Sequence, residues 1–159
     1  MKHKGKFEET DLYLDIKNGL SGLIPTDVRE VIREVRESSQ GTLWVEIGKT
    51  LNSFPITEEV DKFKLREKIE PFMYQNNISD LDLDKELTEL KKRGYVTIRT
   101  GSRPNYFLGP TFAKAIEFIK IFEDNLIVPL VEELGKNPKY KDYEDLRKIV
   151  ESATLYAVE

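Results

Sequence analysis

The chain has 159 residues, 34% of them charged, and its 29 acidic and 25 basic residues give a net charge of −4. This length fits a single domain, residues 1–159, and the acidic balance argues against a protein that coats nucleic acid over its whole surface. The absence of cysteine excludes disulfides, thiolate zinc sites and cysteine nucleophiles. The one histidine, His3, lies near the N-terminus, so we expect no metal site and no cofactor, and we predict that the protein is not an enzyme.

The sequence contains no candidate for a membrane span, which needs about 18 consecutive apolar residues. The basic N-terminus, Met1 to Lys6, is not followed by an apolar stretch of the kind found in signal peptides. We therefore expect a cytoplasmic protein with no membrane partner.

The first part of the chain predicts two helices. Between Phe7 and Leu20 the apolar spacing fits either a strand or a helix, and the four-residue repeat of Leu12, Ile16 and Leu20 favours the helix. From Thr26 to near Gly41 one apolar stripe predicts an amphipathic helix, formed by Val28, Val31, Ile32 and Val35.

The next segment predicts a short strand and two further helices. Thr42 to Val45 fits a strand, and Val45 to Leu51 fits a short helix, because Trp44, Ile47 and Leu51 recur at spacings of three and four. A helical pattern returns from Thr57 to Gln75, although Pro71 should kink or split it. The core candidates of this helix are Val60, Phe63, Leu65, Ile69 and Phe72.

The best-defined element is a helix at residues 80–93. Ser79 is a candidate cap with Asp82 three residues later, and Gly94 marks the end of the helix. Its leucines, expected in the core, are Leu81, Leu83, Leu87 and Leu90. After Gly94 the apolar period changes from 3.6 to 2, which predicts a hairpin at residues 95–108, with strands at 95–99 and 105–108 and a tight turn between them.

The C-terminal part predicts more helices. One begins at Thr111 and carries Phe112, Ile116, Ile119 and Phe122, before Pro129 bends it and Gly135 with Pro138 ends it. A last helix begins near Tyr143. The predicted fold class is mainly α with a small β-hairpin.

The run from Leu87 to Arg99, the strand from Arg103 to Pro110 and the long helix that follows resemble the winged-helix regulators of the MarR and PadR type, over residues 78–122. The resemblance implies a winged helix-turn-helix core at residues 26–110, with helix 80–93 as the recognition helix and 95–108 as the wing. It also implies a long C-terminal helical extension at 111–159, where we expect homodimerisation. The helix from Val60 to Phe72 is then an insertion.

Charge supports a nucleic-acid partner locally. Residues 91–114 contain six basic residues and no aspartate or glutamate, and basic groups beside a hairpin are suited to phosphate contact. An arginine at a wing tip can also enter a narrow minor groove. The candidate duplex-DNA-binding residues are Lys85, Thr88, Lys91, Lys92, Arg93, Arg99, Arg103 and Asn105.

The same charges fit a second hypothesis. A basic hairpin is also an ordinary solvated surface, and the acidic start of helix 80–93, with Asp80, Asp82 and Asp84, repels phosphate while it suits the helix dipole. The second hypothesis is a winged-helix protein-interaction module that acts as an accessory subunit of a larger complex. Its partner would be a protein rather than DNA.

Overall fold

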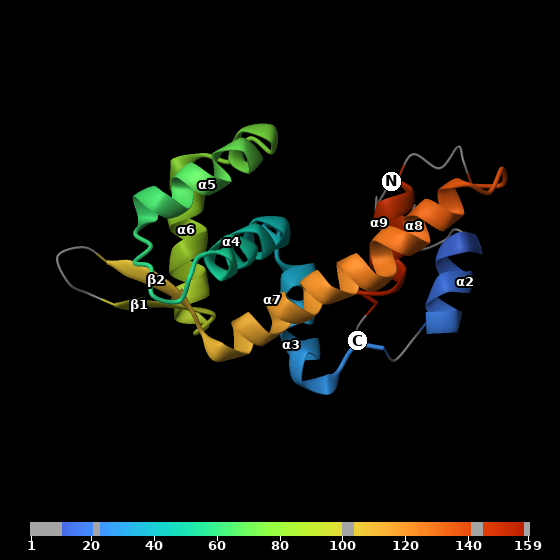
Figure 1. Ribbon diagram of the computed structural model, residues 1–159, viewed down its shortest axis with the longest axis horizontal. Helices are drawn as coiled ribbons and strands as arrows, with labels where there is room; N and C mark the ends of the chain where they lie inside the picture. Colours follow the sequence, from blue (N-terminus) through green and yellow to red (C-terminus); the bar gives the residue numbers. More distant parts are fainter. Residues whose placement is uncertain (1–10, 21–22, 100–103, 141–144, 158–159) are drawn as a thin grey trace. The chain divides into compact units, whose positions relative to one another are not determined.

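The computed structural model describes residues 11–20, 23–99, 104–140 and 145–157. The described chain is mainly helical with one small two-stranded antiparallel sheet, as the sequence predicts (Figure 1). It forms two compact units. We call the part up to Arg33 and from Phe118 onward the terminal unit, and the part from Glu34 to Glu117 the central unit. The boundaries predicted at 26–110 and 111–159 stay predictions.

The terminal unit is built from helices. It contains α2 (Asp11–Leu20), the start of α3 (Thr26–Glu37), the end of α7 (Pro110–Phe122), η1 (Glu123–Ile127), α8 (Val128–Gly135) and α9 (Leu146–Ala153). Helix α9 packs against α2, η1 and α8. The helix favoured at the N-terminus is confirmed over its described part, where Leu12 and Ile16 are buried. The core of this unit includes Leu12, Ile16, Val28, Ile32, Ile119, Ile127, Ile149 and Val150.

A π-helical turn, η1, joins α7 to α8. The backbone N–H of Val128 donates to the carbonyl of Glu123, five residues earlier, instead of to the usual fourth. Pro129 follows directly and has no N–H to donate, so an ordinary α-helical pattern cannot run unbroken through this point. The sequence did not predict this π-helical turn, and the bend at Pro129 stays a prediction, whereas α8 ends at Gly135 as expected.

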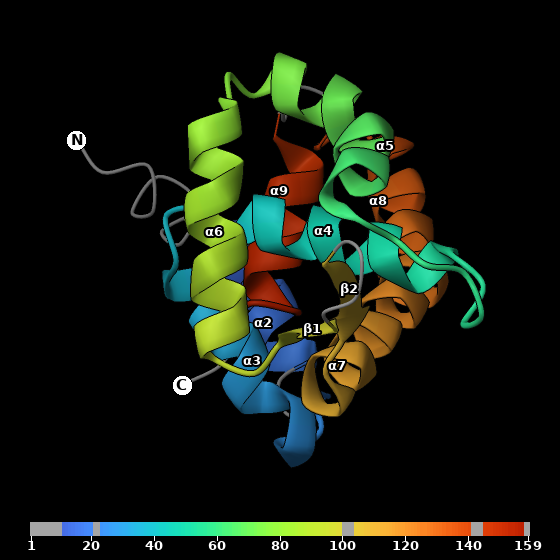
Figure 2. The same ribbon diagram turned by 90° about the vertical axis from the view of Figure 1, so that its left-hand side faces the viewer.

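The central unit contains α4 (Gly41–Ser53), α5 (Lys62–Gln75), α6 (Asp80–Lys92), β1 (Val96–Arg99) and β2 (Asn105–Leu108), followed by the start of α7. Helix α4 packs against α5 and β2, and α6 packs against β1. Figure 2 shows α5 and α6 joined by a short turn, with the hairpin near the far end of α6. The core of this unit includes Trp44, Ile47, Leu65, Ile69, Leu83, Leu90, Phe112 and Ile116.

Two predicted elements of the central unit are wrong. The strand at Thr42 to Val45 does not form, because α4 is one helix in which Trp44, Ile47 and Leu51 are buried along a single face. Helix α5 begins at Lys62 rather than Thr57, because the side chain of Asp61 caps it by accepting a hydrogen bond from the backbone N–H of Lys64 at 2.8 Å.

The sequence also misplaced parts of the core. Helix α5 continues through Pro71 to Gln75 without a split, and Pro71 is exposed, so water can reach the carbonyl that the missing N–H leaves free. Phe63 and Leu81 were expected in the core, but they are 79% and 78% exposed. Phe72 is only half-buried, and Met73 takes the buried position instead.

Helix α4 approaches α7 closely at Gly48. A Cβ atom at this position would lie 2.4 Å from Cδ1 of Ile116 and 3.0 Å from Cε2 of Phe112. Phe112 in turn stacks on Tyr95, with ring centroids 5.0 Å apart. The start of α7 is thus fixed against both α4 and the residue that precedes the hairpin.

The hairpin follows α6 through a tight cap. Gly94 has φ of +77°, a left-handed conformation that favours glycine, and the N–H of Tyr95 donates to the carbonyl of Leu90 at 2.9 Å. In the strands, Val96 pairs with Leu108 and Arg99 pairs with Asn105. The predicted strands are confirmed, whereas most of the predicted turn, including Arg103, lies outside the described residues.

On its other side β2 contacts the segment before α5. The N–H of Tyr106 donates to the carbonyl of Val60 at 2.8 Å, and Asn105 forms an isolated bridge with Asp61. The hairpin is therefore tied to the start of α5 as well as to the end of α6. In the part of the chain that the structure describes, every helix is too short or too polar to cross a membrane.

Candidate nucleic-acid interface

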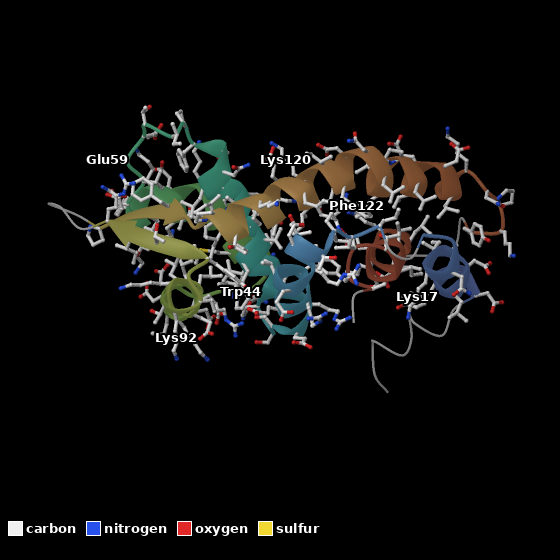
Figure 3. The ribbon with its side chains drawn as sticks, turned by 90° about the horizontal axis from the view of Figure 1, so that it is seen from below. Lys17, Trp44, Glu59, Lys92, Lys120 and Phe122 are labelled. Carbon is white, nitrogen blue, oxygen red and sulfur yellow. The ribbon has the colours of Figure 1, made fainter. Side chains whose placement is uncertain are left out.

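Helix α6 has one buried and one exposed face. Leu83, Glu86, Leu87 and Leu90 are buried. The exposed positions opposite them recur at spacings of four, three and four residues, which places them along one stripe of an α-helix. We call this stripe the outer face of α6, formed by Leu81, Lys85, Thr88 and Lys92. Figure 3 shows Lys92 pointing outward from the helix.

The first turns of α6 are acidic, but the structure pairs their charges with α5. Asp80 accepts from Nε of Arg66 at 2.5 Å, and Asp84 forms an ion pair with Lys62. The pKa of Arg66 is raised, first by its hydrogen bond to Asp80 and then by the one to Glu70. These carboxylates therefore bind neighbouring cations, which reduces the repulsion that they would exert on phosphate.

Asp82 takes part in the predicted helix cap. Ser79 Oγ accepts from the N–H of Asp82 at 3.1 Å, and the carboxylate of Asp82 accepts from the N–H of Ser79 at 3.0 Å. The backbone hydrogen bond from Ser79 is the main cause that lowers the pKa of Asp82. The charge of Asp82 is thus used to start the helix.

Arg93, a predicted DNA contact, binds carboxylates of the protein itself. Its Nε lies 2.7 Å from Glu89 and its Nη1 lies 2.5 Å from Glu34, and the guanidinium lies 5.0 Å from the ring of Trp44. The pKa of Arg93 is raised, first by the hydrogen bond to Glu89. Glu34 also accepts from the hydroxyl of Tyr95 at 2.7 Å. Arg93 therefore joins α3 to the end of α6 and is set apart from the outer face.

Sequence reasoning missed the role of Glu86. Its Oε1 accepts a hydrogen bond from Nε1 of Trp44 at 2.9 Å, and both side chains are buried. The signal was present, because a buried tryptophan needs an acceptor for its N–H and Glu86 lies in the same periodic row as the core leucines. With this bond, every acidic residue of α6 has a partner inside the protein.

The remaining basic candidates form fewer interactions with the protein's own carboxylates. Across the described ranges, no ion pair involves Lys85, Lys91, Lys92 or Arg99. The three lysines and Thr88 are exposed on α6. The Arg99 guanidinium lies 4.6 Å from the ring centroid of Phe107 in the hairpin. The structure thus gathers Lys85, Thr88 and Lys92 on one stripe, while Arg99 and the half-buried Asn105 pair across the hairpin.

A groove of about 570 Å³ runs beside the hairpin, and the sequence did not predict it. Apolar side chains dominate its walls, and Arg99 contributes a cationic group. Tyr106 also lines it, and burial is the main cause that raises the pKa of this tyrosine. The apolar walls include Leu51, Phe54, Ile56, Phe107 and Leu108.

Metal ligands do not cluster in the part of the chain that the structure describes. Among those residues, no group of three or more histidine, aspartate or glutamate side chains lies close enough together to hold a metal ion. Comparison of the chain with models of protein families, with curated proteins and with solved structures finds no match.

Proposed function

We propose that the protein is a winged-helix DNA-binding protein that regulates transcription, and that it contacts duplex DNA through α6 and the hairpin at residues 95–108. The observation that carries the proposal is the division of charge on α6. Its carboxylates bind partners within the protein, whereas Lys85 and Lys92 extend from the exposed face without an ion pair among the described residues.

The order of elements supports this proposal. Helices α4, α5 and α6 are followed by a hairpin, and the segment at Val60 and Asp61 bonds to β2 from the side opposite β1. We therefore interpret α5 as the middle helix of a three-helix arrangement instead of an insertion, with α6 as the recognition helix. This interpretation removes the need for the inserted helix that the sequence predicted.

The charge pattern supports contact with phosphates. When a lysine binds a DNA phosphate, a counterion is released, and this release strengthens the protein's affinity for DNA in a way that depends on salt. The contribution is independent of sequence and dominates non-specific binding. Lys85 and Lys92 lie two helical turns apart on α6, and Lys91 and Arg99 lie nearby in the chain. An arginine in the hairpin can contact the phosphate backbone of the DNA beside the DNA groove that the helix enters.

We further propose that the protein is a homodimer formed through the helices after Thr111. In α8 the apolar side chains remain only half-buried, and Ile121 near the end of α7 is 51% exposed. A helix with this much accessible apolar surface is suited to pack against a second copy. The half-buried residues are Val128, Leu130, Val131 and Leu134.

The test is the salt dependence of binding to a labelled DNA duplex, measured by fluorescence anisotropy between about 50 and 200 mM salt. The double variant Lys85→Ala, Lys92→Ala should bind more weakly and lower the slope of log K against log salt by about 2. Lys120→Ala removes an exposed lysine of the terminal unit and is the matched control. Absence of duplex binding by the wild type at low salt would overturn the proposal.

One observation favours the second candidate, a protein-interaction module. Large apolar side chains are exposed on the central unit: Ile56 at 94%, Tyr74 at 85% and Phe63. Aromatic residues are enriched in protein interfaces. If this candidate is correct, a partner protein should co-purify at fixed stoichiometry after nuclease treatment, and the double variant Phe63→Asp, Tyr74→Asp should lose it.

A further inference from the structure

Leu81 occupies an unusual position in α6. The other leucines of the helix, Leu83, Leu87 and Leu90, are buried, whereas Leu81 is largely exposed in the first turn. A single exposed leucine is common on protein surfaces and by itself needs no explanation. The position of Leu81 matters because it shares the outer face of α6 with Lys85, Thr88 and Lys92.

The surroundings of Leu81 favour an anionic partner with an apolar group. Asp80 and Asp82, which flank it in the chain, are held by Arg66 and by the cap with Ser79. The next residue along the outer face is Lys85, which has no ion pair among the described residues but whose charge helps to lower the pKa of Asp82. A purely apolar protein partner would bury this lysine at a cost, whereas a polyanion with exposed methyl groups would match both residues.

We propose that Leu81 reads the 5-methyl group of a thymine in the major groove. This inference rests on the proposed DNA-binding function and adds a specificity determinant to it. The first turns of a recognition helix are the part that contacts base edges, and the thymine methyl is the apolar group that a base pair presents in the major groove. Lys85, one turn further along, then reaches a phosphate or a guanine edge.

The expected size of the effect follows from the area of one methyl group. Removing one buried methyl from an interface weakens binding by about fourfold. The effect is local to one base pair of each binding site, whereas loss of a lysine weakens binding to every sequence alike.

The test begins with selection of preferred sites from a library of random duplexes by the full-length wild-type protein. Each thymine of the selected duplex is then replaced, one at a time, by deoxyuridine, which lacks the methyl group. Binding of every duplex is measured for the wild type, for Leu81→Ala and for Ile56→Ala, a matched control that shortens an exposed aliphatic side chain elsewhere in the central unit. Circular dichroism checks that each variant is folded.

We expect one replacement to weaken wild-type and Ile56→Ala binding about fourfold and to leave Leu81→Ala binding unchanged. If a motif is selected but no replacement matters, or if Leu81→Ala keeps the discrimination, the inference is overturned and DNA binding stands. Binding without any sequence preference also overturns it. If the wild type binds no duplex, the proposed function and the inference fail together. Because the deoxyuridine replacement changes only the DNA, the wild-type protein alone can overturn the inference. That result does not depend on whether Leu81→Ala folds.

Discussion

The indole nitrogen of Trp44 donates a hydrogen bond to the carboxylate of Glu86 across 2.9 Å in the interior of the central unit. The two residues are 42 positions apart in the chain and come from α4 and α6. Because Trp44 is buried in the core, this bond holds the middle of α6 from its buried side, while the outer face remains exposed.

Trp44→Phe should therefore destabilise the protein through its effect on Glu86. The variant removes the donor and leaves a buried carboxylate without its partner, which costs about 1–3 kcal/mol. Glu86→Leu in the Trp44→Phe background should recover part of this loss, because an apolar group then fills the site. Urea unfolding followed by far-ultraviolet circular dichroism measures the difference. Equal midpoints for wild type and Trp44→Phe would show that the bond adds nothing to stability.

The cap of α6 should make stability sensitive to acid. Because the pKa of Asp82 in the folded protein lies below its ordinary 3.8, the stabilisation is complete above that value and is lost as the pH falls through the lowered pKa. Asp82→Asn removes this titration. The wild type should be the more stable protein at neutral pH, and its advantage should shrink below about pH 4. Urea midpoints measured across this range check the prediction, and parallel curves for the two proteins would contradict it.

Gly48→Ala should destabilise the contact between α4 and α7. The new methyl group would overlap Ile116, and overpacking of this kind costs about 1–3 kcal/mol, partly offset because alanine favours a helix by about 1 kcal/mol more than glycine. Ile116→Val should relieve the overlap in the double variant. Gly135→Ala is the control, because a Cβ there meets no described atom within 4 Å. In thermal unfolding the Tm of Gly135→Ala should equal or exceed that of the wild type. An unchanged Tm for Gly48→Ala would contradict the prediction and show that α4 and α7 adjust to the added methyl group at little cost.

Ile121→Glu should convert the proposed dimer to a monomer. The side chain is half-exposed within one chain, so the substitution leaves the core intact, but it places a charge where a second copy would pack. Sedimentation equilibrium measures the mass of the wild type and the variant. Ile56→Glu adds the same charge at a more exposed position of the central unit and should remain dimeric. A monomeric wild type at high concentration would remove the basis for this interface.

The sequence predicted α6 and the hairpin well because their signals are local. Ser79 and Asp82 form a capping box within four residues, and Gly94 has the positive φ that the end of the helix needs. The change of apolar period after Gly94 marks the strands. None of these features depends on a distant part of the chain.

Some errors arise where contacts with residues distant in the chain determine the local structure. Thr42 to Val45 has the composition of a strand, but burial of Trp44 against the rest of the central unit overrides that preference. Leu81 is an error of another kind: it lies two residues before the buried Leu83, so helical periodicity alone already places it on the exposed side with Lys85 and Thr88.

The charges of the candidate site could not be assigned from the sequence for the same reason. Arg93 meets Glu34, which is 59 residues away, and Asp80 meets Arg66, which is 14 residues away. In the sequence, the acidic residues of α6 outnumber its basic residues, which makes the helix look acidic. In the folded protein Asp80, Asp84 and Glu86 meet partners from α5 and α4, whereas the lysines of the outer face have no ion pair among the described residues.

Asp61 serves two elements at once. It caps α5 through the N–H of Lys64 and forms a β-bridge with Asn105 at the start of β2. The position of β2 is therefore fixed in part at the residue where α5 starts. We therefore expect a change in the length of the loop at residues 54–59 to leave the pairing of Arg99 with Asn105 unchanged.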